Sequence, residues 1–129
     1  MYEGDTPMRV MILAKSTPDS EHAEHDQGGF DAMGQFTREL VDAGLLLDAG
    51  GLQPSSRGAK VRYERKRQTI IDGPFTEAKE LVAGFWIWQV QSLDEALEWL
   101  KRAPFPEGQE IEVRPVLEPD ALGATAESR

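Results

Sequence analysis

The hydrophobic and polar positions along the chain alternate between strand-like and helix-like patterns. Residues 10–14 are five consecutive apolar residues, a short and partly β-branched run that is typical of a strand buried on both faces. From Phe30 to Gly44 the apolar positions recur at helical spacing, and Gly44 stands where a glycine commonly ends a helix. A second strand begins at residues 45–47, and the glycine pair at 50–51 ends or bends it.

The middle of the chain predicts a β-hairpin with a basic tip. Residues 60–64 and 68–72 are its two strands, with Val61 and Tyr63 alternating against polar neighbours. The basic residues at the tip form a run of like charge, which usually marks a solvated segment. Residues 72–75, Asp-Gly-Pro-Phe, predict a turn after the hairpin. The Asp side chain can bind nearby backbone, Gly accepts positive φ and Pro fixes φ in advance.

Residues 82–90 form the strongest apolar strand of the sequence. Phe85 and Ile87 point to one face of the sheet, and Trp86 and Trp88 point to the other. Both faces of this strand must therefore be covered.

A short capped helix and a last strand complete the pattern. In the capping box at 92–95, the Ser92 side chain should accept a hydrogen bond from a first-turn amide, and the Glu95 side chain should bind the Ser92 amide. Trp99 lies at the margin of the apolar stripe, Pro104 stops the helix, and residues 110–116 alternate as a strand. We expect this helix to bury Leu93, Ala96, Leu97 and Leu100.

The order β-α-β, hairpin, β-α-β predicts a ferredoxin-like α+β sandwich with an inserted hairpin arm. We place a single domain at residues 8–118 and flexible tails at 1–7 and 119–129. Two helices cover only one face of such a sheet, and an exposed aromatic and branched face usually marks an interface. Burying each of these side chains contributes roughly 1.5–3 kcal/mol, so we expect another surface to cover the second face.

Composition excludes several functional classes. A net charge of −9 disfavours nucleic acid as a partner. The absence of cysteine excludes a disulfide framework, a thiolate nucleophile and cysteine-ligated metal. The sequence has neither an apolar window of membrane-spanning length nor a signal-peptide layout, so we expect a cytoplasmic protein that does not bind membranes.

The stretch at 72–80, DGPFTEAKE, followed by VAGFW at 82–86, resembles the signature of the DGPF branch of the YCII-related family. Further similar segments lie at 8–13, 33–36, 39–44, 51–56, 96–99 and 110–114. The resemblance implies a ferredoxin-like fold and a homodimer, sheet against sheet, in a dimeric α/β-barrel arrangement, whereas the activity of the family is largely unestablished. Relatives are often encoded beside extracytoplasmic-function sigma factors, which implies an accessory role there. Relatives also commonly carry a Glu within 47–52, where this chain has Gly50.

Asp72 is the sharpest catalytic candidate. At a strand end beside an aromatic-rich sheet, desolvation would raise the pKa of a carboxylate and suit it to general acid–base chemistry. Its structural interpretation is an Asx-turn in which the side chain accepts backbone amides. His22 and His25 lie in an acidic loop and are candidates either for an acid–base partner of Asp72 or, on weak grounds, for metal ligands.

Two further groups are candidates for substrate binding. Glu77 and Lys79 either line the mouth of a pocket, with Lys79 holding an anion, or belong to a solvated, salt-bridged helical turn between Thr76 and Leu81. A second group either lines a cavity for a planar ligand whose carboxylate Arg114 would pair, or fills the core and the dimer interface. This group is Tyr63, Trp86, Trp88 and Arg114.

Three functional hypotheses follow. The first is a cofactor-free small-molecule enzyme, such as an isomerase or lyase, with Asp72 as acid or base in a pocket between the sheet and the hairpin arm. The second is a non-catalytic ligand-binding or regulatory module, favoured by an apolar cavity without convergent polar groups. The third is a purely structural dimer. Gly50-Gly51 lacks the frame of a phosphate-binding loop, so nucleotide binding has no support.

Overall fold

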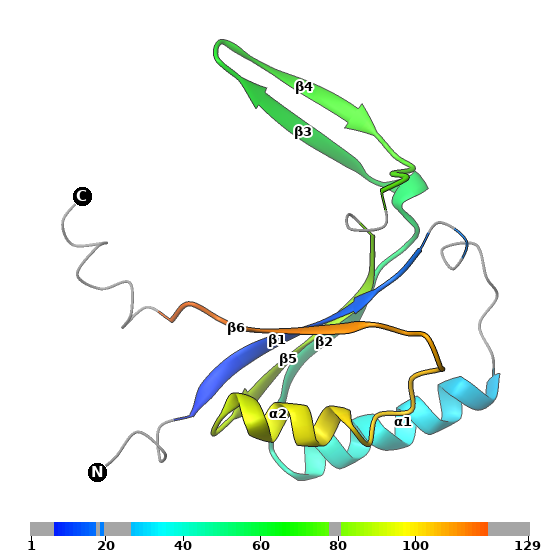
Figure 1. Cartoon of the computed structure of the whole chain (residues 1–129), viewed down its shortest axis with the longest axis vertical. Helices are drawn as coiled ribbons and strands as arrows, with labels where there is room; N and C mark the ends of the chain where they lie inside the picture. The colour runs from blue at the N-terminus through cyan, green and yellow to red at the C-terminus, as the bar shows by residue number, and fades with distance from the viewer. Residues whose placement is uncertain (1–6, 18, 20–26, 78–80, 119–129) are drawn as a thin grey trace.

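The computed structural model of the protein describes residues 7–17, 19, 27–77 and 81–118 (Figure 1). In chain order the elements are β1 (Met8–Lys15), α1 (Gln27–Asp42), β2 (Leu46–Gly51), the short 3-10 helix η3 (Ser55–Arg57), β3 (Ala59–Glu64), β4 (Arg67–Asp72), β5 (Val82–Val90), α2 (Leu93–Leu100) and β6 (Ile111–Pro115). The tails predicted at 1–7 and 119–129 lie outside the described residues, except for Pro7.

Four strands form one antiparallel sheet in the order β2-β5-β1-β6, and β3 and β4 form a separate two-stranded sheet. Figure 1 shows α1 and α2 on one side of the four-stranded sheet and the β3–β4 hairpin rising on the other side. This arrangement confirms the predicted ferredoxin-like α+β fold with a hairpin inserted between its two β-α-β units. Neither described helix is long and apolar enough to cross a membrane.

The core lies between the sheet and the two helices. Trp88 of β5 is fully buried, and Phe36 of α1 packs near it with ring centroids 6.5 Å apart. The Phe36 ring also lies 5.8 Å from that of Trp86 and 6.1 Å from that of Trp99, so aromatic rings from β5 and α2 surround it. The expected division of β5 is confirmed, since Trp86 and Trp88 belong to the helix-facing side. The buried core is completed by Val10, Ile12, Leu40, Leu45, Val90 and Ala96.

α1 ends as the sequence predicts and begins earlier. Gly44 has φ +78°, its N–H donates to the Val41 carbonyl at 3.0 Å, and the Leu45 N–H donates to the Leu40 carbonyl at 2.9 Å. These are the two hydrogen bonds of a Schellman motif, which favours glycine at that position. The helix begins at Gln27, three residues before the predicted start at Phe30. The hydrophobic pattern could not reveal this start, because none of residues 27–29 is apolar.

The capping of α2 differs from the prediction in one bond. Ser92 Oγ accepts from the Glu95 amide at 3.1 Å, as expected. Glu95 Oε1, however, accepts from the Gln91 amide at 2.7 Å, so the expected bond to the Ser92 amide is wrong. The glutamate reaches one residue further back and satisfies the donor that precedes the cap.

The buried face of α2 is also rotated from the expected one. Ala96 is buried, and Trp99 and Leu100 pack against the core, while Leu93 and Leu97 are 38% and 41% exposed. The predicted burial of Leu93 and Leu97 is therefore wrong. α2 has eight residues, and its orientation places Trp99 against Phe36. The indole covers Phe36 with a larger apolar surface than a leucine would supply.

Candidate functional site

A cavity of about 390 Å³ lies on the helix-facing side of the sheet. Its walls come from three neighbouring strands, from α1 and from the loop that follows α2. The lining residues are Ile12, Ala14, Met33, Ala49, Gly50, Gly51, Gly84, Phe85, Trp86 and Phe105. None of these side chains is titratable, so the cavity offers an apolar surface.

Small residues on adjacent strands create this hollow. In the strand register, Gly84 of β5 lies opposite Ala14 of β1 and Gly51 of β2, and Ala49 lies opposite Trp86. A Cβ placed on Gly51 would meet no atom within 4 Å, whereas one on Gly84 would lie 2.9 Å from the Gly50 carbonyl oxygen. Because these positions carry glycine or alanine, they leave open space over the sheet. The glycines also let β2 approach β5 closely.

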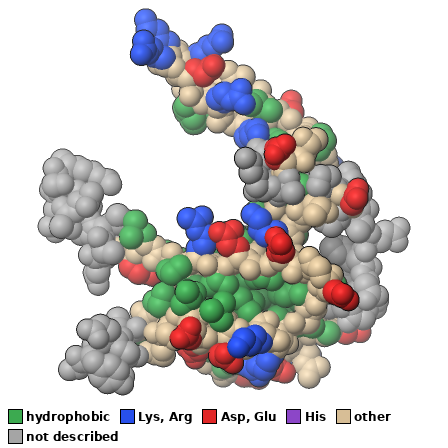
Figure 2. Space-filling view, in the orientation of Figure 1, with side chains coloured by type: hydrophobic (Ala, Val, Ile, Leu, Met, Phe, Trp, Pro, Cys, Tyr) green, Lys and Arg blue, Asp and Glu red, His purple; other side chains and the backbone are tan. Residues whose placement is uncertain are grey.

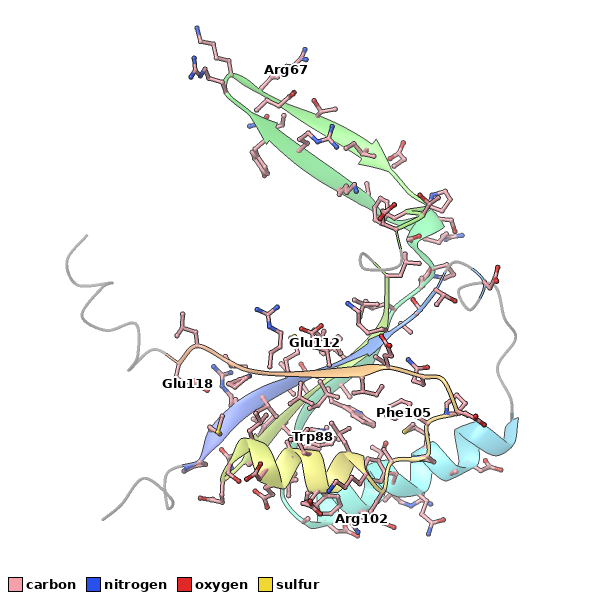
Figure 3. The ribbon with its side chains drawn as sticks, in the orientation of Figure 1. Arg67, Trp88, Arg102, Phe105, Glu112 and Glu118 are labelled. Atoms are coloured by element: carbon pink, nitrogen blue, oxygen red, sulfur yellow. The ribbon has the colours of Figure 1, made fainter. Side chains whose placement is uncertain are left out.

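Aromatic rings form one side of the cavity. The centroids of Trp86 and Phe105 are 5.8 Å apart with an interplanar angle of 57°. Figure 3 shows Phe105 and Trp88 on the helix side of the sheet and Glu112 on the opposite side. Because Phe105 comes from an irregular segment after α2, the periodic patterns of the sequence did not mark it as a site residue.

Two buried polar atoms lack a hydrogen-bond partner within the described part of the chain. They are Ser16 Oγ and Trp88 Nε1. Neither residue lines the cavity. The cavity therefore contains no buried, unpaired polar side chain that is directed at a ligand.

Asp72 lies at the end of β4, opposite Ala59 in the hairpin, and is exposed. It is not among the residues that line the cavity. The role of Asp72 stays a prediction.

The turn that follows Asp72 fastens the base of the hairpin. The Gly73 N–H donates to the Gly58 carbonyl at 2.9 Å, and the Phe75 N–H donates to Ser55 Oγ at 3.0 Å. Lys60 Nζ lies 4.7 Å from the centroid of the Phe75 ring. A Cβ on Gly73 would lie 1.8 Å from the Ser55 carbonyl oxygen, so this close approach requires glycine. The Gly-Pro-Phe part of the signature thus has a structural role in holding the hairpin.

Three of the four remaining polar candidates lie in parts of the chain that the structure does not describe. His22, His25 and Lys79 lie outside the described residues, as do residues 78–80 of the helical turn predicted between Thr76 and Leu81. Glu77 is exposed. No group of three or more metal-binding side chains occurs among residues 7–17, 19, 27–77 and 81–118.

The four residues predicted to surround a planar ligand do not lie together. Trp86 lines the cavity, and Trp88 is buried in the core behind it. Tyr63 projects from the hairpin with 76% of its surface exposed. Arg114 of β6 lies on the opposite face of the sheet, with its Nε 3.7 Å from Glu112 Oε2. Trp86 is therefore the predicted ligand-binding residue that the cavity contains.

The face of the sheet that the helices do not cover, hereafter the open face, is apolar at its centre. Met11, Leu13, Phe85 and Ile87 are half-buried on it. At the β6 side, Glu112 lies 3.8 Å from Lys15 Nζ and 3.7 Å from Arg114 Nε. Figure 2 shows basic and acidic side chains along this border of the molecule.

Gly50 lies directly against the Phe85 ring. A Cβ on Gly50 would lie 2.8 Å from Cε1 of Phe85, so the phenyl ring occupies the space that a side chain at position 50 would need. A glutamate at this position would require the Phe85 ring to move. Because the Phe85 side chain lies on the open face, Gly50 allows close packing on that face.

Comparison with known proteins identifies the family. Residues 8–120 match the YCII-related domain, which is most of the chain. The chain belongs to the YCII-related domain family. An uncharacterised protein of Rhizobium meliloti (strain 1021) is 33% identical over 95 residues, which are 72% of this YCII-related chain and 77% of that protein. Because that relative is itself uncharacterised, the similarity establishes membership of the family and leaves the activity to be argued from the site.

Proposed function

We propose that this YCII-related chain is a non-catalytic binding module that holds a small apolar, aromatic molecule in the cavity. The supporting observation is the cavity itself, about 390 Å³ in volume and lined without a titratable side chain. Small-molecule sites are commonly clefts of roughly 300–1,000 Å³ with mainly apolar walls. A planar ligand suits the tilted faces of Trp86 and Phe105, because aromatic rings favour offset and edge-to-face contacts.

The alternative is a cofactor-free isomerase or lyase with Asp72 as its acid or base. A general base must lie within hydrogen-bond reach of the proton that it removes, or reach it through one water. Asp72 is on the hairpin and is not part of the cavity wall, so this geometry favours the binding module over the enzyme. An accessory role beside a sigma factor, in which a bound ligand changes a protein contact, stays a prediction for the same module.

For the assembly, we propose a homodimer formed by the open faces of two copies. Met11, Leu13, Phe85 and Ile87 place apolar surface on a side of the sheet that no described helix covers. Sheets pack face to face about 10 Å apart, and two-fold dimers are the commonest oligomers. A second sheet would exclude water from these side chains.

Ligand binding can be tested with indole and naphthalene as neutral aromatic probes. We expect either probe to shift the indole N–H signal of Trp86 in a ¹H–¹⁵N NMR titration. Gly51→Val should abolish the shift because the added side chain fills space that holds no atom within 4 Å of the Cβ. Ala59→Val is the matched control, since it adds similar bulk to an exposed strand position outside the cavity.

The two functional hypotheses give different results. An unchanged Trp86 signal at millimolar probe would refute the cavity as an aromatic site, and undiminished binding by Gly51→Val would place any binding elsewhere. Asp72→Asn should leave probe binding unchanged if the module is non-catalytic. A turnover activity that Asp72→Asn removes, with binding preserved, would instead establish the enzyme.

A further inference from the structure

We infer that the hairpin arm, residues 59–72, is a clasp that closes over a second copy of this chain. This inference rests on the proposed homodimer, and it adds a contact that stacking of the open faces alone does not supply. The starting observation is that, among the strands of the described residues, β3 and β4 pair only with each other. The described hydrogen bonds that hold the arm to the rest of the chain lie at its base, from Gly73 to Gly58 and from Phe75 to Ser55. An isolated two-stranded hairpin is at best marginally stable in water, so the arm needs a further contact.

One face of the arm is apolar and exposed. In the hairpin register Val61 lies opposite Ile70, and Tyr63 lies two residues along the same face. Their exposed fractions are 45%, 70% and 76%. Three large apolar side chains on one face of a narrow ribbon form a surface that is suited to cover by another protein.

The other face of the arm is mainly polar, with Ile71 beside Lys60 near the base, and it is internally paired toward the tip. Thr69 Oγ1 donates to Glu64 Oε1 at 3.0 Å, and Arg67 Nε lies 3.2 Å from the same oxygen. Lys60 belongs to this face and contacts the Phe75 ring at the base. This face is satisfied in solvent, so the difference between the two faces identifies the apolar one as the contact surface.

The position of the arm suits a partner that sits on the open face. Figure 1 shows the arm extending from the sheet on the side opposite to the helices and overhanging that side. A second sheet stacked about 10 Å from the open face would occupy the space beneath the arm. Two-fold symmetry would place the second arm over the first copy in the same way, giving two equal contacts.

Charge favours a second copy as the occupant. The arm carries five basic side chains and two carboxylates, a net charge of +3 within a chain of net charge −9, so the rest of the chain carries −12. Figure 2 shows Lys and Arg side chains at the tip and along the arm. An acidic body attracts a basic arm, and the body of a second copy is acidic. The overall charge of −9 opposes a nucleic acid as the partner.

Sedimentation velocity over a dilution series measures the proposed contact. We expect Tyr63→Ser combined with Ile70→Ser to raise the dimer dissociation constant by about tenfold or more, because buried aromatic residues often dominate interfaces. The matched control is Arg62→Lys with Thr69→Ser, at the adjacent pair on the opposite face, which keeps the charge and the hydroxyl. The control should change the dissociation constant by less than about threefold.

Amide hydrogen exchange on the unmodified chain provides a second measurement that no variant can confound. Protection of the β3 and β4 amides should rise as the protein concentration passes through the dissociation constant. A chain that is monomeric at every concentration would refute both the dimer and the clasp. A dimer whose dissociation constant is unchanged by Tyr63→Ser with Ile70→Ser would refute the clasp and leave the sheet-to-sheet dimer standing. Arm protection that is independent of concentration, or conferred by a DNA oligonucleotide instead, would also refute the clasp.

Discussion

Replacing Gly73 with alanine should detach the hairpin arm from its base. A Cβ at this position would lie 1.8 Å from the carbonyl oxygen of Ser55 and 2.6 Å from its carbonyl carbon. Both are backbone atoms, so no side-chain rotation can relieve the overlap. The turn would have to retreat by about 1 Å to reach even a 3.0 Å contact, and its hydrogen bonds to Gly58 and Ser55 would be lost.

The size of the effect follows from these contacts. Two hydrogen bonds contribute about 1 kcal/mol each, and overpacking of a close contact costs about 1–3 kcal/mol. Together these terms lower the free energy that holds the base of the arm in place by about 3–5 kcal/mol. Since β3 and β4 form a sheet of their own, this loss should appear as local opening. Hydrogen-exchange protection of the β3 and β4 amides should fall by up to roughly 150- to 5,000-fold, while β1 and β5 keep their protection.

Gly58→Ala is the matched control for this experiment. Its Cβ would lie 3.7 Å from the same Ser55 oxygen, an ordinary van der Waals distance. The same substitution changes the unfolded-state entropy similarly at both sites, so the difference isolates the clash. At equal protein concentration, equal arm protection in Gly73→Ala and Gly58→Ala would refute the structural role of the signature turn.

Three further predictions concern stability. Gly34→Ala in α1 should stabilise the protein by about 0.5–1 kcal/mol in urea unfolding, because the new Cβ meets only an arginine nitrogen at 4.0 Å; a loss of stability would contradict this. Ser92→Ala should cost about 1 kcal/mol by removing the helix cap, and an unchanged urea midpoint would show that the cap is dispensable. Hydrogen bonds from Arg9 lower the pKa of Glu118. The ion pair therefore contributes its full stabilisation of the folded state above the ordinary carboxyl pKa, and this contribution is lost as the pH falls through the lowered pKa. An NMR titration should find the pKa of Glu118 below its usual range, and Arg9→Gln should raise it; no response to Arg9→Gln would contradict the assignment.

The element order and most element ends could be predicted because their signals are local. Gly44 ends α1 through its own positive φ, and Ser92 caps α2 through an amide three residues away. The two faces of β5 follow from alternation, which is a property of any extended strand. The likeness of residues 72–86 to a family signature pointed to the family that the comparison identified.

Signals of this kind failed where several elements compete for one surface. The apolar stripe of α2 could not decide between Leu97 and Trp99, because the choice depends on Phe36 from another helix. Asp72 stood out by its place in the signature, yet the residue of that turn with the most constrained surroundings is Gly73. Nothing near Gly73 in the sequence shows that the Ser55 backbone lies against it.

By itself, the sequence determined the fold class, the hairpin and the presence of an apolar second face, since each depends on periodicity and turn residues within a short stretch. Only the tertiary structure decided the candidate site. The cavity exists because Ala14, Gly51 and Gly84 meet on three adjacent strands and Phe105 closes over them from a loop. The hollow forms where small residues from different strands become neighbours in the folded chain. The order of residues along the sequence does not record which of them become neighbours.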